Sequence, residues 1–306
     1  LMAKLINKKA SATKRVIVYG ASFSGKSLLV GKLAEHFNLL WVDLEAGHGV
    51  LYQLPPAYQE KIEIVSLPDT RSYPIGIETM LKLVKGPVDI CELHGKVNCM
   101  VCKRNDADVI HVDVNSMQPD TILVIDTLTQ LSNSAISNIT KGQPDDYKLN
   151  FDDYGNLGKL LDIVLSHIQQ ANYNVIVISH ENEVVTEGKK TTLSPTGGTR
   201  NFSRNITKYF TDVVYLERKN KKHTCISTTT SSTSVIAGSQ SGVALETLGE
   251  PSLLPLFRPD LAPMPEVPAT TLGLGKKGTV KPQGTVAGQT SSILAGLKAK
   301  QALAKK

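Results

Sequence analysis

The segment from Gly20 to Ser27 has the residue types and spacing of a phosphate-binding loop. It reads Gly-Ala-Ser-Phe-Ser-Gly-Lys-Ser, matches G-x-x-x-x-G-K-[ST], and stands between a predicted strand that includes the apolar run 16–19 and a helical pattern. Glycines let the backbone fold around phosphates, so that N–H groups and a helix N-terminus point at them. Lys26 is expected to reach the β- and γ-phosphate oxygens, and the Ser27 hydroxyl to ligate Mg²⁺. The motif predicts a site for ATP and Mg²⁺ formed by Gly20, Ala21, Ser22, Phe23, Ser24, Gly25, Lys26, Ser27 and Leu28.

Two acidic residues, one at the end of a predicted strand and one just beyond another, are expected to complete this site. Asp126 ends the apolar run 122–125, where a Walker B carboxylate holds the metal ion through water. Glu45 lies just beyond the predicted strand 39–43, where a carboxylate can orient and deprotonate the water that attacks the γ-phosphate. Asp43 competes for that role, and either of these two acids could be structural. An Asp at a strand end also often caps the next helix, which is the alternative for Asp126.

His180 follows the apolar predicted strand 174–179, at the edge of the sheet where enzymes with such a loop commonly sense the γ-phosphate. Its imidazole could donate a hydrogen bond to that group, although a single histidine also commonly serves as a structural hydrogen-bonding residue. The predicted catalytic set is therefore Lys26, Glu45, Asp126 and His180.

A second kind of chemistry is indicated by the pattern Cys91-x-x-His94-x4-Cys99-x-x-Cys102. Spacing by two residues lets one tight turn offer two ligands, so the two pairs predict a tetrahedral Zn²⁺ site. Four protein ligands leave no open position, which favours a structural staple or a recognition knuckle. His111 could replace His94, and reduced cysteines could also bind nothing. Cys225, on a predicted strand, is expected to be a buried thiol.

The elements that must position these residues alternate between short β-branched runs and amphipathic stretches, which is typical of a mostly parallel sheet covered by helices. The clearest helix is 156–171, because its apolar residues follow the i, i+3, i+4, i+7 spacing of one buried face. Helices are also predicted at 75–85 and 127–139. The Cys/His stretch 86–116 interrupts the alternation and is predicted to be an insertion. Strands are predicted at 16–20, 39–43, 62–66, 121–126, 174–179, 212–217 and 223–229.

Composition limits the classes of protein that fit. The chain has 306 residues, of which 41% are hydrophobic and 20% charged, so it can bury a core and is not disordered throughout. No apolar run approaches the roughly 18 residues of a membrane span, and the first residues lack the apolar region of a secretory signal. We therefore expect a cytoplasmic protein with no membrane partner. Four cysteines are too few for a disulfide scaffold.

The net charge of +6 is concentrated at the two ends of the chain. Residues 1–15 carry five Lys/Arg and no acid, and residues 250–306 carry eight against three acids. We predict a basic N-terminal arm at 1–14, a core at 15–248 and a low-complexity, disordered basic tail at 249–306. The end of that tail, 291–306, could form a basic helix on a replication or recombination partner, or could simply aid solubility.

A nucleic-acid site in the core must then be a local patch. Residues 199–222 contain seven Lys/Arg and two acids, and the polar loop before them adds Lys189 and Lys190. A phosphate backbone is expected here, with a solvated loop as the alternative. Arg200 and Arg204 share a face of a predicted helix, and they could reach a neighbouring subunit's γ-phosphate instead of DNA.

Four of these motifs, in their order and spacing, resemble the ATPase core of RecA-type recombinases: residues 20–27, 42–45, 123–127 and 177–180. Residues 196–215 are similar to the segment after the second DNA-binding loop of RecA. The chain looks closer still to the short phage RecA-like proteins, some of which act as single-strand annealing proteins. The resemblance covers roughly 15–230. Departures are Ser179-His180 where RecA has Gln or Asn, the lack of a clear Phe-x-x-Ala motif before the core, and the cysteine insertion.

The resemblance implies an α/β RecA-like P-loop NTPase core in a homo-oligomer that hydrolyses ATP on single-stranded DNA. Its work would be phage recombination, annealing or replication, in the host cell cytoplasm if the chain is phage-encoded. One alternative is a small-molecule or nucleotide kinase, which Glu45 and the lack of an Arg-rich lid disfavour. Another is a non-catalytic, nucleotide-switched adaptor that docks through its zinc insertion and basic tail.

Overall fold

The computed structural model describes residues 13–70, 73–105, 108–185, 191–220, 222–229 and 234–261. All of these residues belong to one compact unit, and the other unit, 266–306, lies outside the described residues. The predicted arm 1–14 is described only from Thr13, and the predicted tail 249–306 only as far as Leu261. Within the described ranges, no helix is long and apolar enough to cross a membrane.

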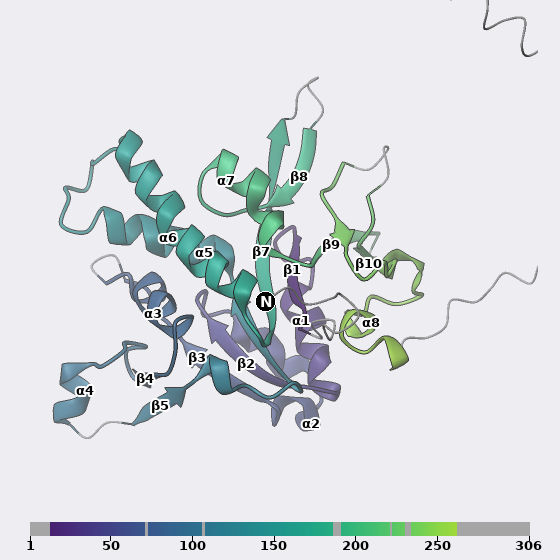
Figure 1. Ribbon diagram of the computed structural model, residues 1–306, viewed down its shortest axis with the longest axis horizontal. Helices are drawn as coiled ribbons and strands as arrows, with labels where there is room; N and C mark the ends of the chain where they lie inside the picture. The colour runs from purple at the N-terminus through teal and green to yellow at the C-terminus, as the bar shows by residue number, and fades with distance from the viewer. Residues whose placement is uncertain are drawn as a thin grey trace, which may run out of the picture. The chain divides into compact units, whose positions relative to one another are not determined.

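A mostly parallel sheet forms the centre of the fold (Figure 1), as predicted. In the described residues its main path is β10-β9-β1-β7-β6-β2-β3, with β10 antiparallel at one edge and the other strands parallel. Short β8 extends β7 as a hairpin, β11 pairs with β9, and β4 and β5 form a separate pair. The strands are β1 (Arg15–Gly20), β2 (Asn38–Asp43), β3 (Ile62–Ser66), β4 (Val88–Cys91), β5 (Val109–Val112), β6 (Thr121–Asp126), β7 (Asn174–Val185), β8 (Thr191–Pro195), β9 (Asp212–Lys219), β10 (Lys222–Ile226) and β11 (Gly238–Ser239).

Helices cover both faces of the sheet, because successive residues of the central strands point to opposite faces and both sets are apolar. Ile17 and Tyr19 belong to an apolar core shared with α3, α5 and α6, whereas Val16 and Val18 belong to one shared with α1 and α8. Figure 1 shows these two groups of helices on opposite sides of the sheet. The helices are α1 (Lys26–Gly31), α2 (Pro56–Gln59), α3 (Ile75–Leu83), α4 (Met100–Arg104), α5 (Leu128–Ile139), α6 (Phe151–Gln170), α7 (Arg200–Asn205) and α8 (Leu254–Phe257).

Several predicted element boundaries differ from the structure. The strand predicted at 174–179 continues to Val185, because its second half pairs with β8. The helix predicted at 156–171 begins at Phe151, because Asn150 and Asp153 form a capping box that satisfies backbone N–H groups of the first turn. The strand predicted at 223–229 ends at Ile226. Beyond it, the Ser227 and Thr228 hydroxyls donate to the carboxylate of Glu246, which draws the chain away from β9.

The Cys/His insertion, 86–116, packs against the main core. Val88 and Ile90 on β4 and Val112 on β5 are buried in the same apolar cluster as α3 and α5. The Thr79 hydroxyl of α3 also donates to the carbonyl oxygen of Gly95, at 2.8 Å. The insertion therefore shares the core of the fold.

The core also extends past the boundary predicted at 248. Leu253 and Leu256, at and within α8, are each 1% exposed and pack in the cluster that contains α1. Phe257 lies 5.7 Å from Phe37, measured between ring centroids. The residues up to 257 therefore belong to the folded core.

Gly20 allows the closest backbone approach at the start of the phosphate-binding loop, and Gly20→Ala tests it. An ideal Cβ at this position would lie 2.4 Å from the carbonyl oxygen of Leu216, a backbone atom of β9 that cannot move away freely. We expect a loss of unfolding free energy on the order of 1–3 kcal/mol in urea denaturation.

The matched control is Gly155→Ala in α6, where nothing lies within 4 Å of the added carbon. Because alanine favours a helix over glycine, this variant should gain about 0.5–1 kcal/mol. Equal unfolding midpoints for the two variants would contradict the close contact between β1 and β9.

Candidate active site

The strand register brings the predicted catalytic residues to one edge of the sheet. Gly20 at the end of β1 is opposite His180 on β7, and Asp43 at the end of β2 is opposite Asp126 at the end of β6. Because all four strands are parallel, their carboxyl ends meet at this edge, where ligands bind in open α/β sheets. Glu45 follows Asp43 by two residues and faces the same region.

The loop between β1 and α1 has the conformation that a phosphate-binding loop requires. Gly25 has φ +91°, in the left-handed region, and the helix begins directly after it at Lys26. The Ser24 N–H donates to the carbonyl oxygen of Ala21, which closes the turn. At the tip of the loop, Ala21, Ser22 and Phe23 are exposed.

Lys26 lies inside this loop, only 6% exposed. Its ammonium group donates to the carbonyl oxygens of Gly20, at 3.1 Å, and Ala21, at 2.8 Å. Burial lowers the pKa of Lys26, and the nearby carboxylates of Asp126, Glu45 and Glu181 partly oppose that shift. A phosphate chain in the loop would bring this buried charge further negative partners.

Ser27 and Asp126 form the pair expected to hold Mg²⁺. The Ser27 hydroxyl donates to Oδ2 of Asp126 at 2.9 Å, and the Asp126 side chain is buried at the end of β6. Burial raises the pKa of Asp126 to about 6, which the Ser27 hydrogen bond partly counteracts. In the same loop, the buried hydroxyl oxygen of Ser24, Oγ, has no hydrogen-bond partner among the residues that the structure describes. This donor set and this unpaired hydroxyl fit a magnesium-bound triphosphate.

Glu45 and Asp43 have different surroundings. The Asp43 carboxylate accepts hydrogen bonds from the backbone N–H groups of Glu45, Gly47 and His48, and it contacts His48 Nδ1 at 2.6 Å. It therefore holds the turn after β2. The Glu45 carboxylate instead faces the edge of the sheet, where it accepts from the Thr127 hydroxyl. Its pKa is lowered, chiefly by its contact with His180 and next by Thr127, so it is ionised at neutral pH.

His180 connects the two halves of the site. Its Nε2 lies 3.3 Å from Oε1 of Glu45, and its Nδ1 lies 3.4 Å from the hydroxyl oxygen of Ser22 in the phosphate-binding loop. Its backbone N–H donates to the Thr129 hydroxyl at the start of α5. The imidazole thus lies between the phosphate-binding loop and the carboxylate of Glu45.

Two residues that contact the loop were not predicted as part of the site. Nη1 of Arg218, on β9, donates to the carbonyl oxygen of Phe23 at 3.3 Å, and Nδ1 of His223, on β10, lies 2.8 Å from that of Ser24. The sequence places Arg218 only in the basic segment and His223 only in a predicted strand. Because these residues lie 195 and 199 positions from the loop residues that they contact, no local pattern indicates the contacts.

The basic residues of the segment 199–222 have different contacts. Arg218 supports the phosphate-binding loop, and Lys219 pairs with Glu217 at 2.6 Å. Lys222 lines a cavity of about 490 Å³ beside this loop, together with Gly25, Leu28, Leu29, Lys32, Leu216, His223, Thr224, Gly249, Glu250 and Pro251. Arg200 and Arg204 are both exposed on α7, and Lys208, just after this helix, is exposed as well. Lys189 and Lys190 lie outside the described residues.

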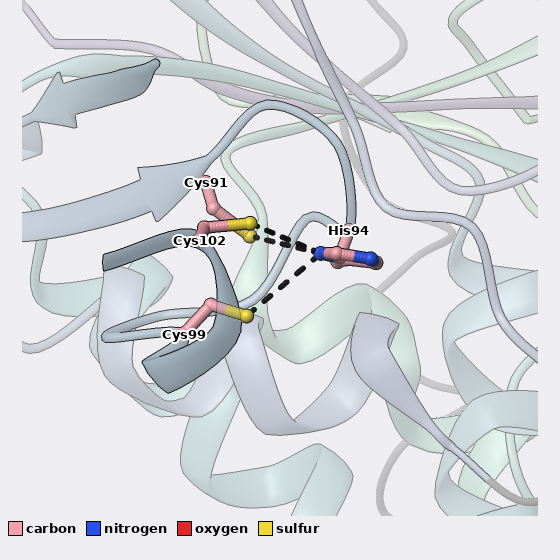
Figure 2. A group of neighbouring side chains, drawn as sticks. All are labelled: Cys91, His94, Cys99 and Cys102. Carbon is pink, nitrogen blue, oxygen red and sulfur yellow. Dashed lines mark hydrogen bonds between the residues drawn. The ribbon is translucent and has the colours of Figure 1, made fainter. Parts of the chain in front are cut away.

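The Cys/His cluster of the insertion is separate from this site. Cys91, His94, Cys99 and Cys102 gather so that their ligand atoms lie within 4.8 Å of one another. Figure 2 shows the three sulfur atoms pointing toward the same ring nitrogen of His94. His111 is not part of the group, since it pairs with Asp89 at 2.7 Å. Cys225 is a buried thiol, as predicted.

Comparison with protein families agrees with this arrangement. The model of an AAA domain family matches residues 12–241, which includes the phosphate-binding loop, both strand-end acids and His180. The chain belongs to this family. The family is one of P-loop ATPases, which implies ATP and usually Mg²⁺ as its ligands. Comparison with curated proteins yields no match.

Two solved structures are similar to part of this AAA domain. One is a prototypical ATPase from the type III secretion system of pathogenic bacteria, with a TM-score of 0.37 and 13% identity over 67% of this chain and 52% of that one. The other is the assembled ATPase EscN from the type III secretion system of enteropathogenic E. coli, with a TM-score of 0.32 and 15% identity over 67% and 43%. The chain thus spans about half of their length. Similarity this weak supports no statement about substrate, partner or assembly.

Asp126→Asn should stabilise the AAA domain while weakening its Mg²⁺-dependent nucleotide binding. The folded-state pKa of Asp126, about 6, exceeds its ordinary value of 3.8, so ionisation costs more in the folded state and stability falls as pH rises between these values. Removing the charge should add on the order of 1–3 kcal/mol of unfolding free energy at pH 8, measured in urea without nucleotide or metal.

The gain should shrink at pH 4, where the folded-state carboxyl is already protonated. Asp120→Asn, at an exposed acid just before β6, is the matched control and should change stability little at either pH. A lower unfolding midpoint for Asp126→Asn at pH 8 would show that the Ser27 hydrogen bond outweighs the burial of charge.

Proposed function

We propose that this chain is a RecA-like ATPase of phage type, which hydrolyses ATP with Mg²⁺ and works on single-stranded DNA in recombination, annealing or replication. Membership of a P-loop ATPase family supports the nucleotide part of this proposal. The observation that carries hydrolysis is the ionised carboxylate of Glu45, held at the edge of the sheet between Thr127 and His180. A kinase would need no such base, since its acceptor substrate takes the place of water.

The residues of the loop would bind and orient the triphosphate. The backbone N–H groups around Gly25 and the ammonium group of Lys26 would contact the phosphates, and the Ser27 hydroxyl and Asp126 would hold Mg²⁺. The bound metal ion would supply positive charge that stabilises the phosphate oxygens. The cavity of about 490 Å³ beside Gly25 has the size and position to take the nucleoside end.

Glu45 would act on the attacking water. Its carboxylate would accept a proton from a water molecule placed between Oε1 and the terminal phosphate. His180 contacts both Glu45 and Ser22, so a phosphate that displaces the Ser22 contact would also alter the environment of the Glu45 carboxylate. This gives His180 the position of a γ-phosphate sensor.

The DNA part of the proposal rests on the elements that follow His180. The β7–β8 hairpin returns to the site, where the Thr196 N–H donates to the His180 carbonyl oxygen at 2.8 Å and Ser179 donates to the Thr196 carbonyl oxygen at 2.8 Å. Four residues later the chain enters α7, which exposes Arg200 and Arg204. A DNA strand bound at α7 and the hairpin would therefore be connected through backbone hydrogen bonds to His180.

The assembly we propose is a homo-oligomer in the host cell cytoplasm. Arg200 and Arg204 lie four residues apart on one helix, so they could contact DNA or the ATP of a neighbouring subunit. Residues 276–306 of the basic tail carry seven lysines and would add DNA affinity or a site for a replication or recombination protein.

Lys26→Ala and Glu45→Gln should separate binding from hydrolysis. Lys26→Ala removes the charge that contacts phosphate and should abolish nucleotide binding or turnover. Glu45→Gln should still bind ATP, while phosphate release falls by about two to four orders of magnitude, because the amide cannot accept the proton. Binding is measured with a fluorescent ATP analogue, and turnover by phosphate release.

Glu63→Gln, an exposed glutamate on the neighbouring strand β3, is the control and should keep turnover within about twofold. Near-normal turnover by Glu45→Gln would assign the base to another residue and remove the main support for this mechanism.

The double variant Arg200→Ala with Arg204→Ala should keep basal ATPase activity and lose its stimulation by single-stranded DNA. Contacts to phosphate release counterions, so the salt slope of DNA affinity should fall by roughly 0.7 for each phosphate contact that is lost. Removal of residues 276–306 should also weaken DNA binding and its salt dependence, while leaving the stimulation of ATPase activity intact.

Lys82→Ala with Lys85→Ala removes the same charge from exposed positions of and beside α3 and should behave like the parent chain. Loss of stimulation on tail removal, with normal stimulation in the arginine variant, would favour an adaptor whose partner binds the tail.

A further inference from the structure

The Cys/His cluster is built from two tight turns that the insertion brings face to face. Cys91 ends β4, and the Gly95 N–H donates to the Cys91 carbonyl oxygen at 2.9 Å, which closes the turn that carries His94. Cys99 precedes α4 and Cys102 lies within it, with the Lys103 N–H bonded to the Cys99 carbonyl oxygen at 2.9 Å. Each turn therefore offers two ligand atoms to one centre.

The distances within the cluster fit the edges of a tetrahedron around a metal ion. Nδ1 of His94 lies 3.1 Å from Sγ of Cys102, 3.8 Å from that of Cys99 and 3.9 Å from that of Cys91. A tetrahedral zinc ion with ordinary zinc–sulfur and zinc–nitrogen bonds requires nitrogen–sulfur separations of about 3.6 Å. Figure 2 shows the one imidazole nitrogen facing all three sulfurs.

We propose that Cys91, His94, Cys99 and Cys102 hold one structural Zn²⁺ ion. Three thiolates and an imidazole form a donor set that suits zinc, whereas hard cations such as Mg²⁺ prefer oxygen ligands. Four protein ligands complete the tetrahedron and leave no position for a substrate or a reactive water. No disulfide joins these cysteines, and none of the three is bonded to Cys225.

The charge of the site also has local partners. Three thiolates with one Zn²⁺ leave a net charge of about −1, and the last turn of α4 carries Lys103 and Arg104 beside them. Cys91 and Cys102 are 1% and 0% exposed, so thiolate ligands there require a bound cation in place of water.

The ion would fix the insertion against the end of β3, beside the end of β2 and the turn that carries Glu45. Gly95, next to His94, packs so closely on β3 that an added Cβ would lie 2.7 Å from the Ser66 carbonyl oxygen. The next residue, Leu67, donates its N–H to the Asp43 carbonyl oxygen at 2.9 Å, and the Asp43 side chain holds the turn that contains Glu45. The β4–β5 pair has only four residues on each strand, too few to be stable without support.

Metal analysis of the full chain, purified with reductant and without chelator, tests this proposal. We expect about one zinc per chain in the parent and in Cys225→Ser, the matched control at a buried thiol outside the cluster. Cys99→Ser should lose the metal, and hydrogen exchange over 88–112 should rise at least tenfold while exchange in β1 and β6 stays unchanged. Replacement of zinc by Co²⁺ should give the visible absorption of a tetrahedral cobalt thiolate site.

The metal content is read independently of ATPase activity, so its failure and the failure of the proposed hydrolysis are distinguishable. A parent chain with no metal and no cobalt spectrum would overturn the proposal. So would full zinc retention in Cys99→Ser, or iron in place of zinc, or unchanged exchange over 88–112 after the metal has been removed with a chelator.

Discussion

The register of four adjacent parallel strands is the constraint on which the site depends. Gly20 is opposite His180, and Asp43 is opposite Asp126, so the ends of β1, β7, β6 and β2 reach one edge together. A shift of one residue in any pair would move every side chain of the shifted strand to the opposite sheet face, because side chains alternate along a strand, and would also displace the end of that strand from this edge. The two apolar cores that fix this register therefore also fix the relative positions of the phosphate-binding loop, the metal-side acid and Glu45.

The same edge concentrates charge in a buried region, which costs stability. Burial alone disfavours the charged forms of both Lys26 and Asp126, and each is only partly compensated by neighbouring groups of opposite charge or by hydrogen bonds. Such an arrangement is expected where a protein positions charges for a ligand that will complete them. Glu45 differs, because His180 and Thr127 favour its ionised form, as a proton acceptor at neutral pH requires.

Local patterns predicted the elements and motifs, and long-range contacts account for what they missed. The strands of the central sheet and the helix carrying Leu157 and Leu161 follow from periodicity, since each pattern is set by residues close in sequence. The capping box that starts α6 early is also local and was readable in Asn150 and Asp153. By contrast, the contact of His223 with the phosphate-binding loop depends on the order of strands in the sheet. The packing of 250–257 also depends on long-range contacts. The Pro and Ser residues of this stretch favoured a prediction of disorder, whereas its few leucines pack on the core.

A crystal structure of the chain with Mg²⁺, ADP and beryllium fluoride, which mimics the terminal phosphate, would show whether Glu45 is the hydrolytic base. We expect Mg²⁺ to contact the Ser27 hydroxyl and to reach Asp126 directly or through water, and Lys26 to contact the fluoride group. We also expect a water in line with that group, hydrogen-bonded to Oε1 of Glu45, with His180 within hydrogen-bond distance of the fluoride. A water held by a different carboxylate, with Glu45 still turned to Thr127, would contradict the assignment of the hydrolytic base.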